Sequence, residues 1–423
     1  MKIDYAARRA RIAPQLGLTD EILLVGAGHQ LPKPEISDMM LPFIAHQEYY
    51  YLTGQADALG GVIAYDPREG WVSFVAEVTE AERVWEGLEQ RPGELLSRLD
   101  PWLAARRGRR VVMFGSPVKG VEFDAARTAV VREAYKHARR VKEPAEIELM
   151  RRCATATAAG YAAVQPFLKP GVSERRMQVE LESGYFRDGS MKTGYDTIIG
   201  VGAQSAVLHG TPSRDRVAQE GDFILIDSGA EWDRYVIDVT RTYVAGQPSA
   251  FQRDLMQAVL NAEVRACARC KPGVEWTDIH FGSARDLVGA LVDMGVMKGN
   301  VDSLIEREAH TLFYPHGVGH MLGLGVRDAS GLEPGRTKST RPCLATLRQD
   351  LILRPGYIVT IEPGLYLIPA LLNDPMRREK FHDCVNWTLT EQHLGLGGVR
   401  FEDNILVTDG EPENLTAAIP KSA

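Results

Sequence analysis

The chain has 423 residues, more than one typical domain, so two domains are the starting expectation. Hydrophobic residues make up 44% and charged residues 25%, as in globular proteins, and no apolar run approaches the roughly 18 residues needed to cross a bilayer. A net charge of −7 without a basic block argues against nucleic-acid and anionic-membrane partners.

The first residues and the cysteines bear on location. Residues 1–17 are basic and lack the apolar segment of a secretory signal. Five cysteines are a small, odd number, typical of reduced thiols, and predict a cytoplasmic protein. Cys267 and Cys270 have a CxxC spacing inside a helix-like segment without a second pair, so we interpret them as structural.

The N-terminal part alternates between helical and strand patterns. Helices are predicted at residues 4–17 and 92–105, and strands at 21–27, 61–65, 71–76 and 107–114. This alternation predicts a separate α/β domain over residues 1–140. We find no cluster of catalytic residue types in it.

A second domain is predicted over residues 141–423. Its apolar spacing predicts four helices, at residues 143–167, 174–188, 250–270 and 276–296. The apolar stripes of the last two are typical of helices that cover a sheet. The fold class is therefore α+β, with an antiparallel sheet backed by helices.

Residues 223–229 and 235–244 are predicted to be two strands of a hairpin, and each contains one aspartate in an apolar run, Asp227 and Asp238. Burying an ionised carboxylate costs several kcal/mol unless a partner compensates it. Two such groups brought together also repel each other. One buried salt bridge with a turn aspartate would explain the pattern, and so would bound divalent cations.

Three later motifs add histidine and glutamate to this pair. His316-Gly-Val-Gly-His320 has the spacing of a helical zinc motif, but its glycines disfavour a helix, so we expect a loop with His320 as the candidate ligand. Glu362 and Glu402 stand beside strand-like runs, flanked by glycines. Oxygen ligands with one imidazole suit Mn²⁺, Co²⁺, Fe²⁺ or Zn²⁺. His209, alone on a strand-like segment, is by itself most simply a core histidine.

In this order the motifs resemble the creatinase/methionine-aminopeptidase superfamily of pita-bread fold, and within it the prolidase (Xaa-Pro dipeptidase) branch. The similarity spans residues 140–410 and rests on D-x-G…D-x-T-R-T, H-G-x-G-H, I-E-P-G and G-x-R-x-E-D. It implies two divalent metal ions, with Mn²⁺ as the first choice and Co²⁺, Zn²⁺ or Fe²⁺ as alternatives. The implied metal ligands are Asp227, Asp238, His320, Glu362 and Glu402.

The resemblance also implies the reaction, which is hydrolysis of Xaa-Pro dipeptides by a water that the two ions activate. Asp238 and Glu402 would bridge the ions, and Glu362 would carry the proton. The other implied roles are stabilisation of the reacting carbonyl by His209, substrate contact by His316, a grip on the carboxylate of a C-terminal proline by Arg348, and orientation of the ligands by Arg400 and Thr240.

One position departs from the family pattern. The family continues G-L-x-V-H-D, whereas this chain has Arg327 in place of the histidine. Arginine does not change protonation near neutral pH but can donate hydrogen bonds to an oxyanion or carboxylate, so Arg327 is a candidate substrate-binding residue. The long segment 366–396 after Glu362 resembles the dipeptidase branch.

Other functions stay open. An Xaa-Pro aminopeptidase that acts on longer peptides has the same fold and ligands. A creatinase-like amidinohydrolase does not depend on metals, and a non-catalytic binding protein would not need an intact ligand set. The expected partner is a small peptide ending in proline, and the resemblance implies a homodimer with a creatinase-like N-terminal domain.

Overall fold

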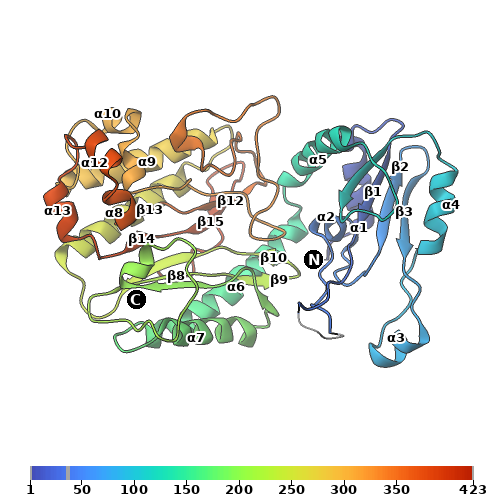
Figure 1. The fold of residues 1–423 in the computed structure, drawn as a ribbon, viewed down its shortest axis with the longest axis horizontal. Helices are drawn as coiled ribbons and strands as arrows, with labels where there is room; N and C mark the ends of the chain where they lie inside the picture. Colours follow the sequence, from blue (N-terminus) through green and yellow to red (C-terminus); the bar gives the residue numbers. More distant parts are fainter. Residues whose placement is uncertain (1, 35–38, 422–423) are drawn as a thin grey trace. The chain divides into compact units, whose positions relative to one another are not determined.

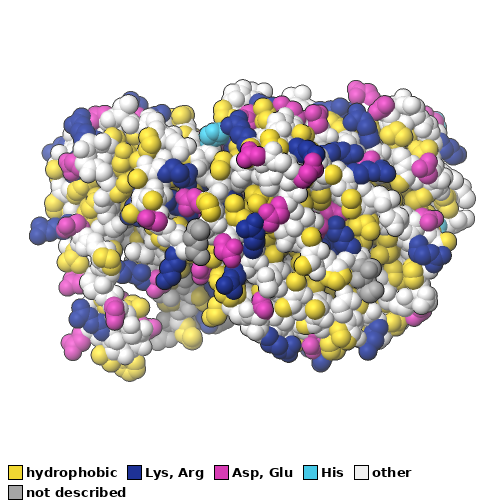
Figure 2. Space-filling view, turned by 180° about the vertical axis from the view of Figure 1, so that it is seen from behind, with side chains coloured by type: hydrophobic (Ala, Val, Ile, Leu, Met, Phe, Trp, Pro, Cys, Tyr) yellow, Lys and Arg dark blue, Asp and Glu magenta, His cyan; other side chains and the backbone are white. Residues whose placement is uncertain are grey.

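A computed structural model describes residues 2–34 and 39–421. The chain divides into two compact units, Met1–Arg139 and Arg140–Ala423. No helix among the described residues has the length and apolarity to pass through a membrane. On the face shown in Figure 2, acidic and basic side chains of the described residues are interspersed.

The first unit is built on one mixed sheet with strand order β4-β3-β2-β1-β5. The strands are β1 (Ile22–Gly26), β2 (Val62–Asp66), β3 (Gly70–Val75), β4 (Glu94–Leu95) and β5 (Val111–Gly115). The helices are α1 (Tyr5–Ile12), α2 (Gln47–Thr53), α3 (Glu80–Trp85), α4 (Leu99–Ala104) and α5 (Ala125–Arg140). Buried apolar side chains of β1, β2 and β5 make its core.

Two predicted helices of this unit are shorter than expected. The α-helix predicted at residues 4–17 ends at Ile12 and continues as a 3-10 helix with Pro14 in its first turn, because proline has no N–H for an α-helical hydrogen bond. The prediction of a helix over 92–105 is wrong in its first part. There, β4 pairs with β3 before α4 begins.

The second unit contains short antiparallel strands with helices outside them (Figure 1). The strands that carry the site are β7 (Ile198–Val201), β8 (Phe223–Asp227), β11 (Thr240–Val244), β12 (Ile358–Ile361) and β15 (Asp403–Leu406). The remaining strands are β6 (Lys192–Thr193), β9 (Ala230–Trp232), β10 (Tyr235–Val236), β13 (Gly364–Tyr366), β14 (Gly398–Arg400) and β16 (Glu413–Asn414). A bridge between Thr240 and Glu402 brings the β7–β8–β11 sheet beside the β12–β15–β16 sheet.

Two pairs of long helices cover these strands. They are α6 (Pro144–Val164) with α7 (Glu174–Arg187), and α8 (Ala250–Ala268) with α9 (Trp276–Asp293). Helix α6 packs against β9 and β10, while α8 packs against β12, β13 and β14. This arrangement of antiparallel strands backed by helices confirms the α+β prediction and the pita-bread fold.

The predicted hairpin is present but broken in the middle. Strand β8 pairs with β11, whereas β9 pairs with β10 in another sheet, so the chain bends at residues 228–229 and again at 237–239. A Cβ added to Gly229 would lie 1.7 Å from the carbonyl oxygen of Ile237, so the close approach of the two bends requires glycine at this position. The bend places Asp238 outside both strands.

The segment after Glu362 forms a helical excursion within a hairpin. Strands β13 and β14 pair with each other, and three short helices lie between them. These helices are α11 (Pro369–Leu372), α12 (Pro375–Lys380) and α13 (Trp387–Gln392).

Candidate metal centre

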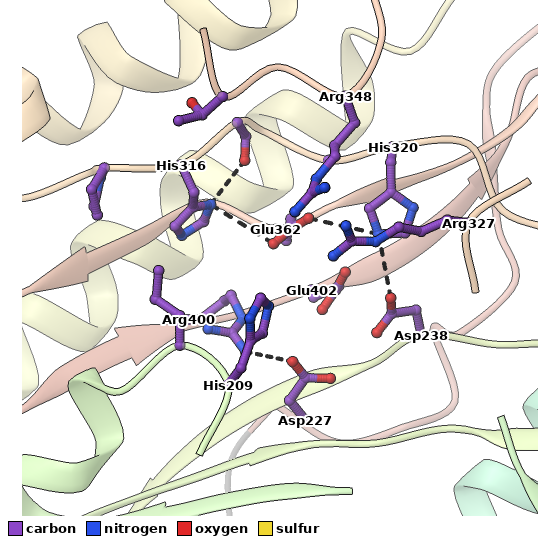
Figure 3. A pocket seen from close by; sticks show the side chains of 15 residues that line it. His209, Asp227, Asp238, His316, His320, Arg327, Arg348, Glu362, Arg400 and Glu402 are labelled. Carbon is purple, nitrogen blue, oxygen red and sulfur yellow. Dashed lines mark hydrogen bonds and ion pairs between the residues drawn. The ribbon is translucent and has the colours of Figure 1, made fainter. Parts of the chain in front are cut away.

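All five predicted metal ligands line one pocket, together with the histidines and arginines predicted to bind substrate (Figure 3). Three of them, Asp238, His320 and Glu402, offer ligand atoms that lie within 4.8 Å of one another, and all three side chains are buried. Glu362 borders this group, with its Oε1 3.9 Å from His320 Nε2. Asp227 borders it on another side.

The position of His320 depends on a close backbone approach. A Cβ on Gly319 would lie 2.0 Å from the carbonyl oxygen of Thr360, so glycine allows this loop to lie against β12. The His320 N–H then donates to Thr360 Oγ1 at 3.1 Å. The His320 ring places Nδ1 3.0 Å from the carbonyl oxygen of Met321 and Nε2 3.5 Å from Asp238 Oδ2. The loop predicted here is therefore what orients the imidazole.

Tyr195 joins the two aspartates. Its hydroxyl lies 2.7 Å from Asp227 Oδ1 and 2.5 Å from Asp238 Oδ1. The sequence analysis did not single out this residue, one of 14 tyrosines, because a tyrosine at the start of a strand-like run is unremarkable. Only the fold places its hydroxyl between two carboxylates.

Arg400 connects the cluster to β11 and β13. Its guanidinium donates to Asp227 Oδ2 at 2.5 Å, to Thr240 Oγ1 at 3.0 Å and to the Tyr366 hydroxyl at 3.0 Å. Thr240 in turn donates to Glu402 Oε2 at 2.7 Å. Arg400 and Thr240 therefore contact the candidate ligands, as predicted, and Tyr366 is a site residue that the sequence analysis missed.

The carboxylates of this cluster are short of positive partners. Burial raises the pKa of Asp227 to about 6 and that of Glu362 to about 7, and the negative charge of neighbouring carboxylates adds to both shifts. Burial and neighbouring carboxylates also raise the pKa of Glu402 well above its usual value. For His320, the charge of Asp238 outweighs burial and raises the pKa.

This imbalance tests whether a metal ion fits. Three buried carboxylates and the half-buried one of Glu362 face one guanidinium, that of Arg400, and one imidazole, that of His320. A divalent cation would compensate the like charges and let the carboxylates stay ionised. The donor set of oxygens with one imidazole nitrogen is what Mn²⁺, Fe²⁺, Co²⁺ and Zn²⁺ accept. The residues present therefore fit a divalent metal centre.

Two neutral histidines border the cluster. His316 places Nε2 2.8 Å from the Tyr366 hydroxyl and Nδ1 2.9 Å from the carbonyl oxygen of Gly317, and burial lowers its pKa to about 3. Burial, followed by the charges of three arginines, lowers the pKa of His209. Both imidazoles are therefore uncharged at neutral pH and can exchange hydrogen bonds with a ligand.

Arg327 and Arg348 lie at the mouth of the pocket, which has a volume of about 250 Å³. Figure 3 shows both side chains reaching into it. Both residues are exposed, and neither makes a side-chain hydrogen bond or ion pair with another described residue. Burial, and next the charge of Arg327, lowers the pKa of Arg348. The pocket thus has acidic walls and two unpaired cations at its entrance.

Comparison with known proteins gives consistent matches. Residues 148–409 match the family model for metallopeptidase family M24. A probable Xaa-Pro aminopeptidase of Tuber melanosporum is 28% identical over 90% of this chain and 86% of its own length. Another from Ajellomyces capsulatus is 26% identical over 98% and 93%.

Solved structures agree with these matches. Aminopeptidase PepP of Pseudomonas aeruginosa has a TM-score of 0.79 with 25% identity, over 99% of this chain and 96% of its own. Aminopeptidase P of Escherichia coli with the inhibitor Pro-Leu also has a TM-score of 0.79, with 24% identity over 100% and 97%. The second likeness shows the fold alone.

Proposed function

Since this chain belongs to metallopeptidase family M24, we propose that it is a metal-dependent peptidase that removes the N-terminal residue from peptides with proline in second position. The observation that carries this proposal is the buried, cation-deficient group of Asp238, His320 and Glu402 in the lining of this pocket. The relatives are named as probable Xaa-Pro aminopeptidases, which supports this activity over that of a dipeptidase.

Two divalent ions would be held in this pocket. The proposed ligands are Asp227, Asp238, His320, Glu362 and Glu402, with Mn²⁺ as the first metal to test. When bound, such ions polarise a carbonyl and lower the pKa of a water molecule. Arg400 and Tyr195 hold Asp227 in place, and Thr240 holds Glu402.

Glu362 is the residue proposed to move the proton. Glu362 lies at the edge of the cluster, with its Oε1 3.9 Å from His320 Nε2, so its carboxylate is placed to exchange a proton with a water held there. Its Oε atoms would take the proton from the attacking water and deliver it to the prolyl nitrogen. This step breaks the peptide bond and releases the amine that begins with proline.

Substrate contacts come from the neutral and cationic side chains at the rim. His209 and Arg327 both line the pocket and would donate hydrogen bonds to the carbonyl oxygen as negative charge develops there. His316, held by Tyr366 and Gly317, would contact the proline ring as an uncharged surface.

A second candidate, the Xaa-Pro dipeptidase, is favoured by one specific observation. Arg348 and Arg327 are unpaired guanidiniums at the mouth of a small pocket. A guanidinium binds a carboxylate through two parallel hydrogen bonds, so either arginine could hold the carboxylate of a C-terminal proline. Such a contact would favour dipeptides.

The test measures hydrolysis of Ala-Pro, Leu-Pro and Ala-Pro-Ala by metal-stripped protein with and without added Mn²⁺. Metal-dependent cleavage of the tripeptide supports the aminopeptidase, and cleavage of the dipeptides alone supports the dipeptidase. Asp238→Asn should be inactive, while Asp254→Asn, an exposed aspartate on α8, should keep wild-type turnover. Failure to cleave any of the three with metal bound would contradict both candidates.

A further inference from the structure

A second cavity adjoins the metal pocket. It has a volume of about 440 Å³, and Pro315 and Thr346 line both cavities. We call it the accessory pocket. Its other lining residues are Glu308, Thr311, Tyr314, Pro342, Cys343, Leu371, Asp374, Met376, Arg377, Lys380 and Phe381.

The helical excursion between β13 and β14 provides one wall of the accessory pocket. Leu371 lies on α11 and Met376 on α12, and Phe381 follows α12 as a buried ring. Tyr314 adds a ring that is only 2% exposed.

Both acidic side chains of the accessory pocket accept hydrogen bonds from nearby residues. Glu308 Oε1 accepts from Arg341 Nε and from the N–H of Cys343, both at 3.3 Å. Asp374 caps α12, its Oδ1 accepting from the N–H of Arg377 at 2.9 Å. Glu308 is therefore paired with a cation, whereas Asp374 keeps its negative charge at the start of α12.

The two basic side chains of the same pocket, Arg377 and Lys380, have no ion-pair partner among the described residues. The Arg377 side chain makes no hydrogen bond or ion pair with a described residue, and Lys380 Nζ only approaches the ring of Phe381, 4.9 Å from its centroid. Arg378, next along α12, is different, because it forms an ion pair with Glu391 and lies outside the pocket. The accessory pocket thus combines apolar walls with two available cations.

We infer that the accessory pocket binds the residue that follows proline in the substrate, with its apolar side chain against Leu371 and Phe381 and its C-terminal carboxylate at Arg377 and Lys380. The inference rests on the proposed function, because it assumes that a peptide lies in the metal pocket. The two cavities adjoin at Pro315 and Thr346, which line both, so a peptide in the metal pocket would have its next residue beside the accessory pocket. The substrate class is then a tripeptide of the form Xaa-Pro-Leu with a free carboxylate.

The experiment compares Ala-Pro-Leu with its C-terminal amide in Mn²⁺-loaded protein. A charge-assisted contact contributes enough binding for the acid to have a kcat/KM about tenfold above that of the amide. In the double variant Arg377→Gln/Lys380→Gln this ratio should fall to about one. The matched control Arg378→Gln removes one charge from the same helix outside the pocket and should keep the wild-type ratio.

A steric variant provides a second, independent measurement. Leu371→Trp should fill the accessory pocket and lower the ratio of kcat/KM for Ala-Pro-Leu over Ala-Pro about tenfold. Equal acid and amide rates in the wild type, or a ratio that the double variant does not change, would overturn the subsite while Xaa-Pro cleavage still stands. Absence of cleavage of every Xaa-Pro peptide would overturn the proposed function, and the subsite with it.

Discussion

Glu402 and Asp403 are neighbours in the chain, both buried, yet their carboxylates lie in opposite electrostatic surroundings. Asp403 has Arg241 Nη2 at 2.7 Å from Oδ1 and Lys421 Nζ at 2.7 Å from Oδ2. These two cations outweigh burial and hold the pKa of Asp403 well below its usual range. Among the described residues the Glu402 carboxylate accepts one hydrogen bond, from Thr240, and its pKa is raised by burial and by neighbouring carboxylates.

Burial of a carboxylate alone therefore does not identify a functional site. The first unit repeats the Asp403 pattern at Asp66, which is fully buried and paired with Arg106 and Arg109. Such a carboxylate is part of a completed structural network. The charges around Glu402 are incomplete within the described protein, and a missing cation is what a metal site requires.

The largest expected effect comes from Glu402→Gln. Removing this carboxylate should release bound metal and lower kcat by about 10³-fold or more, because several kcal/mol of transition-state stabilisation depend on the ions. The free energy of unfolding of the metal-free protein should not fall, since one of several repelling carboxylates is gone. Metal content by mass spectrometry and turnover check this together. Metal retained at full stoichiometry in this variant would contradict the assignment of Glu402 as a metal ligand.

Asp403→Asn should have the opposite result. It leaves the guanidinium of Arg241 buried without its charged partner, so the free energy of unfolding should fall by about 3–5 kcal/mol while metal stoichiometry is kept. The control Asp286→Asn removes the partner of Arg265 and Arg269 near the surface and should cost less than about 1 kcal/mol. Denaturant unfolding measures both. Equal losses of unfolding free energy in the two variants would show that the Asp403 network stabilises the protein no more than an ion pair near the surface.

Arg400→Lys should have an intermediate effect. A lysine ammonium cannot contact Asp227, Thr240 and Tyr366 at once as the guanidinium does. Metal affinity should therefore fall about 10- to 100-fold, as for other residues that orient ligands. Titration of metal-stripped protein measures it. Unchanged affinity would mean that Asp227 does not need this contact.

A further expected effect concerns the pH dependence of stability. In metal-free protein the pKa values of Asp227 (about 6) and Glu362 (about 7) lie above the ordinary 3.8 and 4.5, so the folded state binds more protons than the unfolded chain in this window. Stability should therefore be fully present below about pH 4 and fall as pH rises to 7, by about 1.4 kcal/mol per pH unit and titrating group. The check is the difference between unfolding curves with and without Mn²⁺ at pH 5, 6 and 7. A stability difference that does not change with pH would contradict the raised pKa values of Asp227 and Glu362.

Much of the metal cluster is predictable because of where its charges stand in the sequence. Asp227 and Asp238 interrupt apolar runs, and His320 and Glu362 follow glycine or strand residues. Burying such a group is unfavourable without a compensating charge, and the local sequence offers none. The resemblance to the family groups these residues with Glu402 as one set of metal ligands. The bend between the aspartates is not predictable from strand propensity, because it depends on the contact of Gly229 with Ile237.

The parts that escape prediction depend on long-range packing. Tyr195 and Tyr366 look like ordinary strand tyrosines, and only the fold aims their hydroxyls at Asp227 and Arg400. The short strand β4 replaces the start of a predicted helix because β3 offers it a hydrogen-bonding edge. The accessory pocket also needs Glu308 and Arg377, residues 69 positions apart, to meet.

The Arg241 network has a consequence for how the protein is made. Arg241 also donates to the carbonyl oxygen of Ile419, and Lys421 completes the partners of Asp403. A ribosome adds ~5–20 residues per second, so a nascent chain carries Asp227 for ~10–40 s before residue 421 is synthesised. The strand that presents Glu402 can therefore be locked in place only after synthesis has passed the metal-binding residues. The candidate ligand set is therefore held in its final position only once the C-terminal residues are available.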